Sequence, residues 1–262
     1  MKKLSFIKMH GLGNDFVIID SRKSFFTPEN KLIQKIASRK FGIGCDQLIL
    51  IDNCKDSIAD FKIIIFNSDG SEAETCGNAV RCVGKILLSE SAKTNIIIET
   101  KGGLVDVEID KNNLISVDMG IAKFNWDEIP MSHPVDTNNL GIDFRVLKGG
   151  FAINIGNPHV VFFNDVIDKK EIDSDCEKVS KLKMFSEGVN VNVAKVVSRD
   201  VINLQVYERG CGFTDACGSG ACATLVAASK LNLVDKKAKI RMIGGDLEIN
   251  LLNDSHVLMT GS

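Results

Sequence analysis

Short segments with a strand-like pattern of apolar residues recur along the chain. Residues 104–109 and 247–251 alternate apolar and polar side chains, which is the period of a strand with one buried face. Residues 16–20, 62–66 and 96–99 are short runs rich in β-branched side chains, a composition typical of strands. The hydrophobic pattern therefore predicts a protein in which strands predominate.

Three longer stretches instead have apolar residues at helical spacing. One covers residues 28–40, and we expect Thr27 to be its N-cap because Pro28 suits the first helical position. The other two, residues 76–89 and 217–230, contain small and apolar residues, and each begins with Cys-Gly. Strands grouped around one or two helices predict an α+β fold, with a curved, mostly antiparallel sheet wrapped around a central helix.

Four short motifs occur twice in the same order. The second copy of each follows the first by 141 to 143 residues. The pairs are Gly13-Asn14 with Gly156-Asn157, Cys76-Gly77 with Cys217-Gly218, Gly102-Gly103 with Gly244-Gly245, and residues 117–120 with residues 258–261. This repetition predicts an internal duplication. We expect an N-terminal domain at residues 1–120, a connector plus C-terminal domain at residues 121–262, and an active site in the cleft between them.

Composition narrows the functional classes. The chain has 262 residues and a formal net charge of −2, which gives no electrostatic reason to expect nucleic-acid or membrane partners. It has neither a signal-peptide pattern nor an apolar run of membrane-spanning length, so we expect a cytoplasmic protein. The eight cysteines include no Cys-x-x-Cys motif and the four histidines are scattered, so we expect no metal site.

Cys76 and Cys217 open the two copies of the Cys-Gly helix. A helix N-terminus presents unpaired amides and favours anions, which lowers a thiol pKa and allows nearby N–H groups to hold a carboxylate. The amides expected to do so belong to Gly77, Asn78, Gly218 and Ser219. Two such thiols on opposite sides of a substrate α-carbon would form a two-base racemase. The alternative is that both sulfurs are inert core groups or form a disulfide.

Several motifs together resemble those of a known enzyme family. Residues 67–71 (Asn-Ser-Asp-Gly-Ser) and 76–81 (Cys-Gly-Asn-Ala-Val-Arg) look like the signature of the diaminopimelate epimerases. Other blocks of the family are similar to residues 8–16, 42–47, 156–159, 207–210 and 216–222. The resemblance extends from residue 6 to residue 261. It implies an isomerase with two pseudo-symmetric α+β domains.

The resemblance also implies a reaction and a set of residues. The enzyme would interconvert LL- and meso-2,6-diaminopimelate without a cofactor, in lysine and peptidoglycan precursor synthesis. Cys217 would be the base toward the LL substrate and Cys76 the proton donor, while His159 and Glu208 would modulate the thiol pKa values. Arg209 would bind the distal carboxylate. The full set implied to bind substrate is Asn14, Gln47, Asn67, Gly77, Asn78, Asn157, Asn190, Glu208, Arg209, Gly218 and Ser219.

Two positions depart from the family pattern. Phe213 stands where relatives usually have an acidic residue, and we expect this to affect the surroundings of the site rather than the chemistry. The chain ends at Ser262, whereas relatives generally continue into a short final strand that bears on dimerisation. The resemblance therefore leaves a homodimer open for this sequence.

Other interpretations of the same residues also remain open. The chain could be a two-cysteine racemase of the same fold that acts on proline or hydroxyproline, or a non-catalytic protein in which the cysteine pair is a redox switch. Taken singly, Asn190 could face solvent in its strand-like segment, Arg209 could pair with Glu208 at the surface, and His159 could be a structural histidine.

Overall fold

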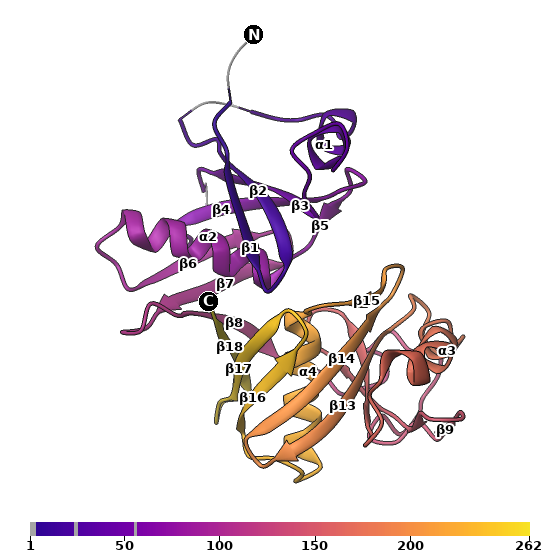
Figure 1. Ribbon diagram of the computed structural model, residues 1–262. Helices are drawn as coiled ribbons and strands as arrows, with labels where there is room; N and C mark the ends of the chain where they lie inside the picture. Colours follow the sequence, from indigo (N-terminus) through magenta and orange to yellow (C-terminus); the bar gives the residue numbers. More distant parts are fainter. Residues whose placement is uncertain (1–3, 24–25, 55–56) are drawn as a thin grey trace. The chain divides into compact units, whose positions relative to one another are not determined.

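The computed structural model describes residues 4–23, 26–54 and 57–262. The chain folds into two compact units (Figure 1). Unit 1 comprises Met1–Asp118 with Gly261–Ser262, and unit 2 comprises Met119–Thr260. No helix within the described ranges is long and apolar enough to cross a membrane.

Unit 1 consists of a sheet and two helices. The strands are β1 (Ile7–Gly11), β2 (Asn14–Asp20), β3 (Gln47–Asp52), β4 (Phe61–Asn67), β5 (Glu72–Ala73), β6 (Asn95–Thr100), β7 (Gly103–Ile109) and β8 (Ile115–Ile121). Their order is β1-β2-β3-β4-β6-β7-β8, with β5 paired to β4. Only the β2–β3 and β4–β6 pairs are parallel among the pairs described here. The helices are α1 (Asn30–Ala37) and α2 (Gly77–Glu90).

Unit 2 repeats this plan. Its strands are β9 (Ile142–Asp143), β10 (Lys148–Gly149), β11 (Phe151–Asn154), β12 (Pro158–Phe163), β13 (Asn190–Ser198), β14 (Val201–Glu208), β15 (Gly212–Thr214), β16 (Lys237–Met242), β17 (Gly245–Leu251) and β18 (His256–Gly261). The order β11-β12-β13-β14-β16-β17-β18, with β15 paired to β14, matches that of unit 1. The helices are α3 (Lys169–Ser180) and α4 (Gly218–Lys230), and β9 and β10 form a separate ribbon.

The two units also agree in strand register. In unit 1 Phe16 pairs with Gln47 across the parallel β2–β3 ladder, and in unit 2 His159 pairs with Asn190 across β12–β13. Each unit therefore has the element order ββαβββαβββ, apart from the β9–β10 ribbon. The predicted α+β class with sheets around central helices is confirmed.

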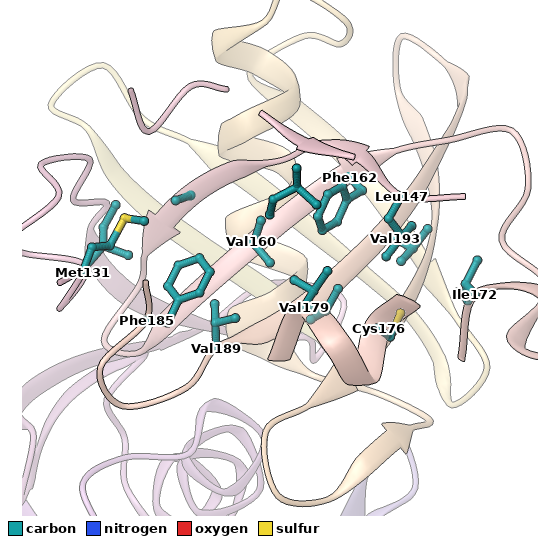
Figure 2. Close-up of a cluster of buried hydrophobic side chains, with 14 residues drawn as sticks. Met131, Leu147, Val160, Phe162, Ile172, Cys176, Val179, Phe185, Val189 and Val193 are labelled. Carbon is teal, nitrogen blue, oxygen red and sulfur yellow. The ribbon is translucent and has the colours of Figure 1, made fainter. Parts of the chain in front are cut away.

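The middle strands of each sheet are covered by a helix on both faces. Figure 2 shows the apolar cluster on one face in unit 2, where Cys176 and Val179 of α3 pack with Val160 of β12 and Val193 of β13. Because successive side chains of a strand point to opposite faces, the intervening residues of β12 and β13 face α4. Helix α4 is buried over almost all of its length, as expected of a central helix of small and apolar residues.

The prediction for the first helix was wrong in its limits. Helix α1 begins at Asn30 rather than Pro28, and its N-cap is Glu29 rather than Thr27. The amides of Leu32 and Ile33 both donate to the Glu29 carbonyl, so this carbonyl starts the helix. The helix ends at Ala37, and the chain then turns so that the amides of Ile43 and Gly44 donate to the Ile36 carbonyl.

Candidate active site

Cys76 and Cys217 are the N-cap residues of α2 and α4, as the sequence predicted. Their backbones are nearly the same, with φ −148° and ψ 107° at Cys76 and φ −139° and ψ 114° at Cys217. Each carbonyl accepts the first helical hydrogen bond, from Val80 at 2.9 Å and from Ala221 at 3.0 Å. The amides immediately after each cysteine have no partner within the helix, so each unit offers an anion site beside a sulfur.

In unit 2, the sulfur of Cys217 contacts a backbone amide and a hydroxyl group. The amide of Gly220 donates to Sγ at 3.4 Å, and the hydroxyl of Ser219 lies 3.5 Å from Sγ. Cys217 is 6% exposed. The sulfur is the acceptor in the Gly220 hydrogen bond, whereas the Ser219 hydroxyl can donate to it or accept from it.

The hydroxyl of Ser219 is connected in turn to His159. Nε2 of His159 lies 3.0 Å from Ser219 Oγ and 2.9 Å from Asn157 Oδ1, while Nδ1 accepts from Asn192 Nδ2 at 3.0 Å. His159 is completely buried, and desolvation lowers its pKa to about 3. The ring is therefore neutral near pH 7, and the Ser219 hydroxyl lies between it and the Cys217 sulfur.

Glu208, at the end of β14, also lies close to Cys217. Thr214 donates to its carboxylate at 2.6 Å. Burial raises the pKa of Glu208, and hydrogen bonds from Thr214 and Cys217 act in the opposite direction. A carboxyl group with a raised pKa beside a sulfur can exchange a proton with it more readily than an exposed glutamate would.

The predicted binding residues of unit 2 form one hydrogen-bonded segment. Asn190 is 2% exposed, so the interpretation of this residue as solvent-facing was wrong. Its Nδ2 donates to the Pro158 carbonyl at 3.2 Å, and its Oδ1 accepts the Arg209 amide at 3.0 Å. The Arg209 guanidinium is exposed and donates to the Glu187 carbonyl at 2.7 Å rather than pairing with Glu208. Asn190 thus fixes the backbone from which Arg209 extends.

In unit 1, the thiol of Cys76 contacts a side-chain amide. The Cys76 thiol lies 3.7 Å from Asn14 Oδ1, and Asn14 donates from Nδ2 to Asp46 at 3.0 Å. Asp46 also accepts the Asp15 amide, which holds the start of β2 in place. Asn78 in the first turn of α2 is 4% exposed.

The remaining predicted residues of unit 1, Gln47 and Asn67, contact each other. Gln47 Nε2 donates to Asn67 Oδ1 at 3.0 Å across the β3–β4 ladder, and Asn67 donates to the Ser71 hydroxyl at 3.1 Å. These two amides occupy the strand ends that correspond to Asn190 and Glu208 of unit 2.

Sequence analysis missed Asn192, Thr214 and Asp46, which all contact predicted site residues. A signal for Asn192 was available, because Asn190 and Asn192 are two apart in a strand and so share a face. Asp46 lies within residues 42–47, one of the segments that carried the family resemblance, and Thr214 lies between two others. Within the described ranges, no group of three or more His, Cys, Asp and Glu side chains is placed to bind a metal ion.

Comparison with known proteins identifies the family of the chain. The family model for diaminopimelate epimerase matches residues 6–125 and 151–262. The diaminopimelate epimerase of Erythrobacter litoralis is 42% identical over 260 residues, which cover 99% of this chain and 94% of that protein. The diaminopimelate epimerase of Pelagibacter ubique is 44% identical over 259 residues, covering 97% of this chain and 93% of the relative.

Solved structures share the fold at low sequence identity. A phenazine biosynthesis protein of the PhzF family from Bacillus anthracis has a TM-score of 0.69 and 14% identity, with 100% of this chain and 96% of that chain covered. A hydroxyproline epimerase from Agrobacterium vitis has a TM-score of 0.67 and 15% identity, with 98% and 87% covered. The whole-length sequence matches, together with the paired N-cap cysteines, show that the chain belongs to the diaminopimelate epimerase family.

Proposed function

We propose that the protein interconverts LL- and meso-2,6-diaminopimelate by proton transfer at the α-carbon, with Cys76 and Cys217 as its two acid–base groups. The observation that supports this most directly is that both sulfurs are N-caps of equivalent helices in the two units. The family to which the chain belongs supports the substrate.

The proposed step needs one thiolate and one thiol. The Cys217 thiolate takes the α-proton, so an S–H bond forms as the Cα–H bond breaks, and the electron pair moves into the adjacent carboxylate. Cys76 then gives its proton to the opposite face of the α-carbon. Inversion is complete, and the two sulfurs have exchanged protonation states; the reverse reaction exchanges their roles. This chemistry requires both sulfurs to reach one α-carbon, so we propose that one substrate molecule contacts Cys76 and Cys217 at the same time.

Charge that develops on the reacting carboxylate needs preorganised donors. We propose that these are the amides of Gly77 and Asn78 at α2 and of Gly218 and Ser219 at α4. Such N–H groups stabilise a developing anion without reorganising during the reaction. His159 and Glu208 adjust the proton affinity of Cys217 through the contacts described above.

The second amino-acid end of the substrate requires its own recognition. We propose that Arg209 binds the distal carboxylate, since a guanidinium can form two parallel hydrogen bonds with it. Asn14, Gln47, Asn67, Asn157 and Asn190 would bind the remaining polar groups. A proline or hydroxyproline racemase would have no use for an arginine at this position.

Two finer points belong to the same proposal. A mechanism based on two thiols needs reduced sulfurs, and the cytoplasm keeps thiols reduced, so we place the reaction there. We also propose a homodimer as the form of the enzyme in solution, following the family resemblance; size-exclusion chromatography with light scattering tests it, and a monomer with full activity would refute it.

The decisive assay is epimerisation in D₂O without added cofactor. Reduced protein incubated with LL-diaminopimelate should yield meso product with deuterium at the inverted α-carbon. A panel of proline, hydroxyproline and other amino acids is run in parallel. Inversion of proline or hydroxyproline alone would overturn the substrate, and absence of deuterium in the inverted product would overturn the proposed proton transfer.

A further inference from the structure

We propose that Asn192 is a positioning residue of the Cys217 site: its amide fixes the tautomer of His159 and so directs the Ser219 hydroxyl hydrogen toward the Cys217 sulfur. The proposal rests on the proposed function in taking Cys217 as an acid–base group. It adds a residue that touches neither the sulfur nor the substrate.

The orientation of the Asn192 amide follows from its surroundings. Nδ2 lies 3.4 Å from the Val160 carbonyl oxygen, which can only accept, so the nitrogen and not the oxygen must be on that side. The same nitrogen lies 3.0 Å from Nδ1 of His159. One N–H therefore goes to each partner, and Nδ1 of the imidazole must be the acceptor.

This arrangement places the single ring hydrogen of neutral His159 on Nε2. From there it points to Asn157 Oδ1 at 2.9 Å and to Ser219 Oγ at 3.0 Å. Ser219 Oγ then accepts from the ring, and its own hydrogen is available for the Cys217 sulfur at 3.5 Å. In the other tautomer Nε2 would carry no hydrogen and would accept the Ser219 hydroxyl hydrogen. Cys217 would then lose the Ser219 hydroxyl as a donor.

Unit 1 has an apolar pair at the positions that His159 and Asn192 occupy in unit 2. The β2–β3 and β12–β13 registers make Phe16 equivalent to His159 and Ile49 equivalent to Asn192. All four are completely buried, so an apolar pair fills the same place in the other copy of the fold. A buried polar pair costs free energy that an apolar pair does not, which points to a role other than packing.

The packing of α4 on Asn192 supports the same conclusion. A Cβ added to Gly220 would lie 2.6 Å from Asn192 Oδ1, so the first turn of α4 approaches this side chain as closely as a glycine permits. Asn192 Oδ1 is buried and has no hydrogen-bond partner among the described residues. The side chain thus serves through its NH₂ group alone, which is the part that contacts His159.

The first test reads the tautomer directly. In protein labelled with ¹⁵N-histidine, His159 should carry its hydrogen on Nε2 and remain neutral down to pH 5. Asn192→Asp replaces the donor with an acceptor and should move a hydrogen to Nδ1. A wild-type His159 with its hydrogen on Nδ1, or a protonated ring at pH 7, would overturn the proposal. This measurement of the His159 tautomer needs no substrate, so its result does not depend on whether the protein acts on diaminopimelate.

The second test reads the effect on the sulfur. In Asn192→Leu the pH profile of Cys217 alkylation, followed by mass spectrometry, should move upward by about 0.5 to 1 pH unit, the size of one lost hydrogen bond. Cys76, in the same sample, should keep its profile. kcat should fall roughly tenfold with KM changed by less than about twofold, because the change acts on proton transfer and not on substrate binding.

Asn203→Leu, on the neighbouring strand β14 and outside the site, is the matched control and should leave both profiles and kcat unchanged. Equal shifts at Cys76 and Cys217, or an Asn192→Leu profile identical to that of the wild type, would assign Asn192 a structural role only.

Discussion

The N-cap residues of α2 and α4 have nearly the same backbone angles, but different side chains occupy the equivalent strand positions of the two units. Behind Cys76 the equivalent positions of β2 and β3 hold Phe16 and Ile49, whereas behind Cys217 they hold His159 and Asn192. Both sulfurs belong to helix N-cap residues, but in unit 2 the Gly220 amide donates to the Cys217 sulfur and His159 contacts Asn192 behind it. The two units thus share the N-cap position of the cysteine and differ in the buried side chains at the equivalent strand positions.

Replacing each cysteine in turn tests whether both sulfurs are required for the proton transfer. Cys76→Ala and Cys217→Ala should each lower epimerisation by about 10³-fold or more, because each removes one of the two proton-transfer groups. Circular dichroism and thermal unfolding should show that both variants remain folded. If either variant retained the wild-type rate of deuterium exchange with inversion, the two-base mechanism would be contradicted.

Replacing His159 and Asn192 with the residue types found at the equivalent positions of unit 1 tests whether the buried polar pair serves catalysis. The double variant His159→Phe/Asn192→Ile should lose about 10- to 100-fold in kcat, since the donor to Ser219 is removed. Its free energy of unfolding should stay within about 1 kcal/mol of the wild type or rise, because both members of a buried polar pair are replaced by apolar groups. Urea denaturation measures the second quantity. A strongly destabilised but fully active variant would show that the polar pair serves the fold.

Arg209 is a second asymmetry, because its equivalent position in unit 1 is Ser68. Arg209→Lys should raise KM for diaminopimelate roughly tenfold and change kcat by less than about threefold, since lysine keeps the charge but cannot form two parallel hydrogen bonds. Steady-state kinetics separates the two effects. An unchanged KM would remove Arg209 from the substrate site.

The asymmetry should also appear in the pH dependence of stability. The folded-state pKa of His159 is lowered to about 3 by burial, so the unfolded chain binds a proton that the folded chain does not between about pH 6.5 and pH 3. The stability from neutral His159 is complete above pH 6.5 and is lost as pH falls, with a slope of about 1.4 kcal/mol per pH unit.

The free energies of unfolding of the wild type and of the His159→Phe/Asn192→Ile variant, measured at a series of pH values, should therefore diverge below pH 6.5 with this slope. Other titrating groups contribute to both curves and cancel in the difference. Parallel curves across that range would mean that His159 becomes protonated in the folded protein.

The smallest effect is expected at Phe213. Its ring packs edge-on against Tyr207 at 5.2 Å, with the Lys169 ammonium 5.3 Å from the ring centre. Phe213→Glu should cost about 0.5 to 1.5 kcal/mol of stability through loss of the aromatic pair. It should change kcat by less than about threefold, because Thr214 and not residue 213 contacts Glu208. A large loss of activity at unchanged stability would show that position 213 acts on Glu208.

Sequence patterns were sufficient where a feature is local. Helices that start at Cys76 and Cys217 follow from Cys-Gly and small residues at helical spacing, and both are found at the predicted positions. The limits of α1 were missed because the residue that starts this helix is decided by which carbonyl receives the first amides. Here it is Glu29, although Thr27-Pro28 has the stronger capping pattern.

The sequence by itself determined the fold class, the family and the two candidate sulfurs. Repeats, periodicity and motifs can be recognised along the chain without knowing which distant residues are in contact. Only the tertiary structure decided that Asn190 is buried, that Asn192 contacts His159, and that the His159 ring is buried and neutral near pH 7. These facts depend on strand register and on what covers each face of the sheet. Residues more than thirty positions apart, such as His159 and Asn192, become partners only when parallel strands bring them side by side and exclude water.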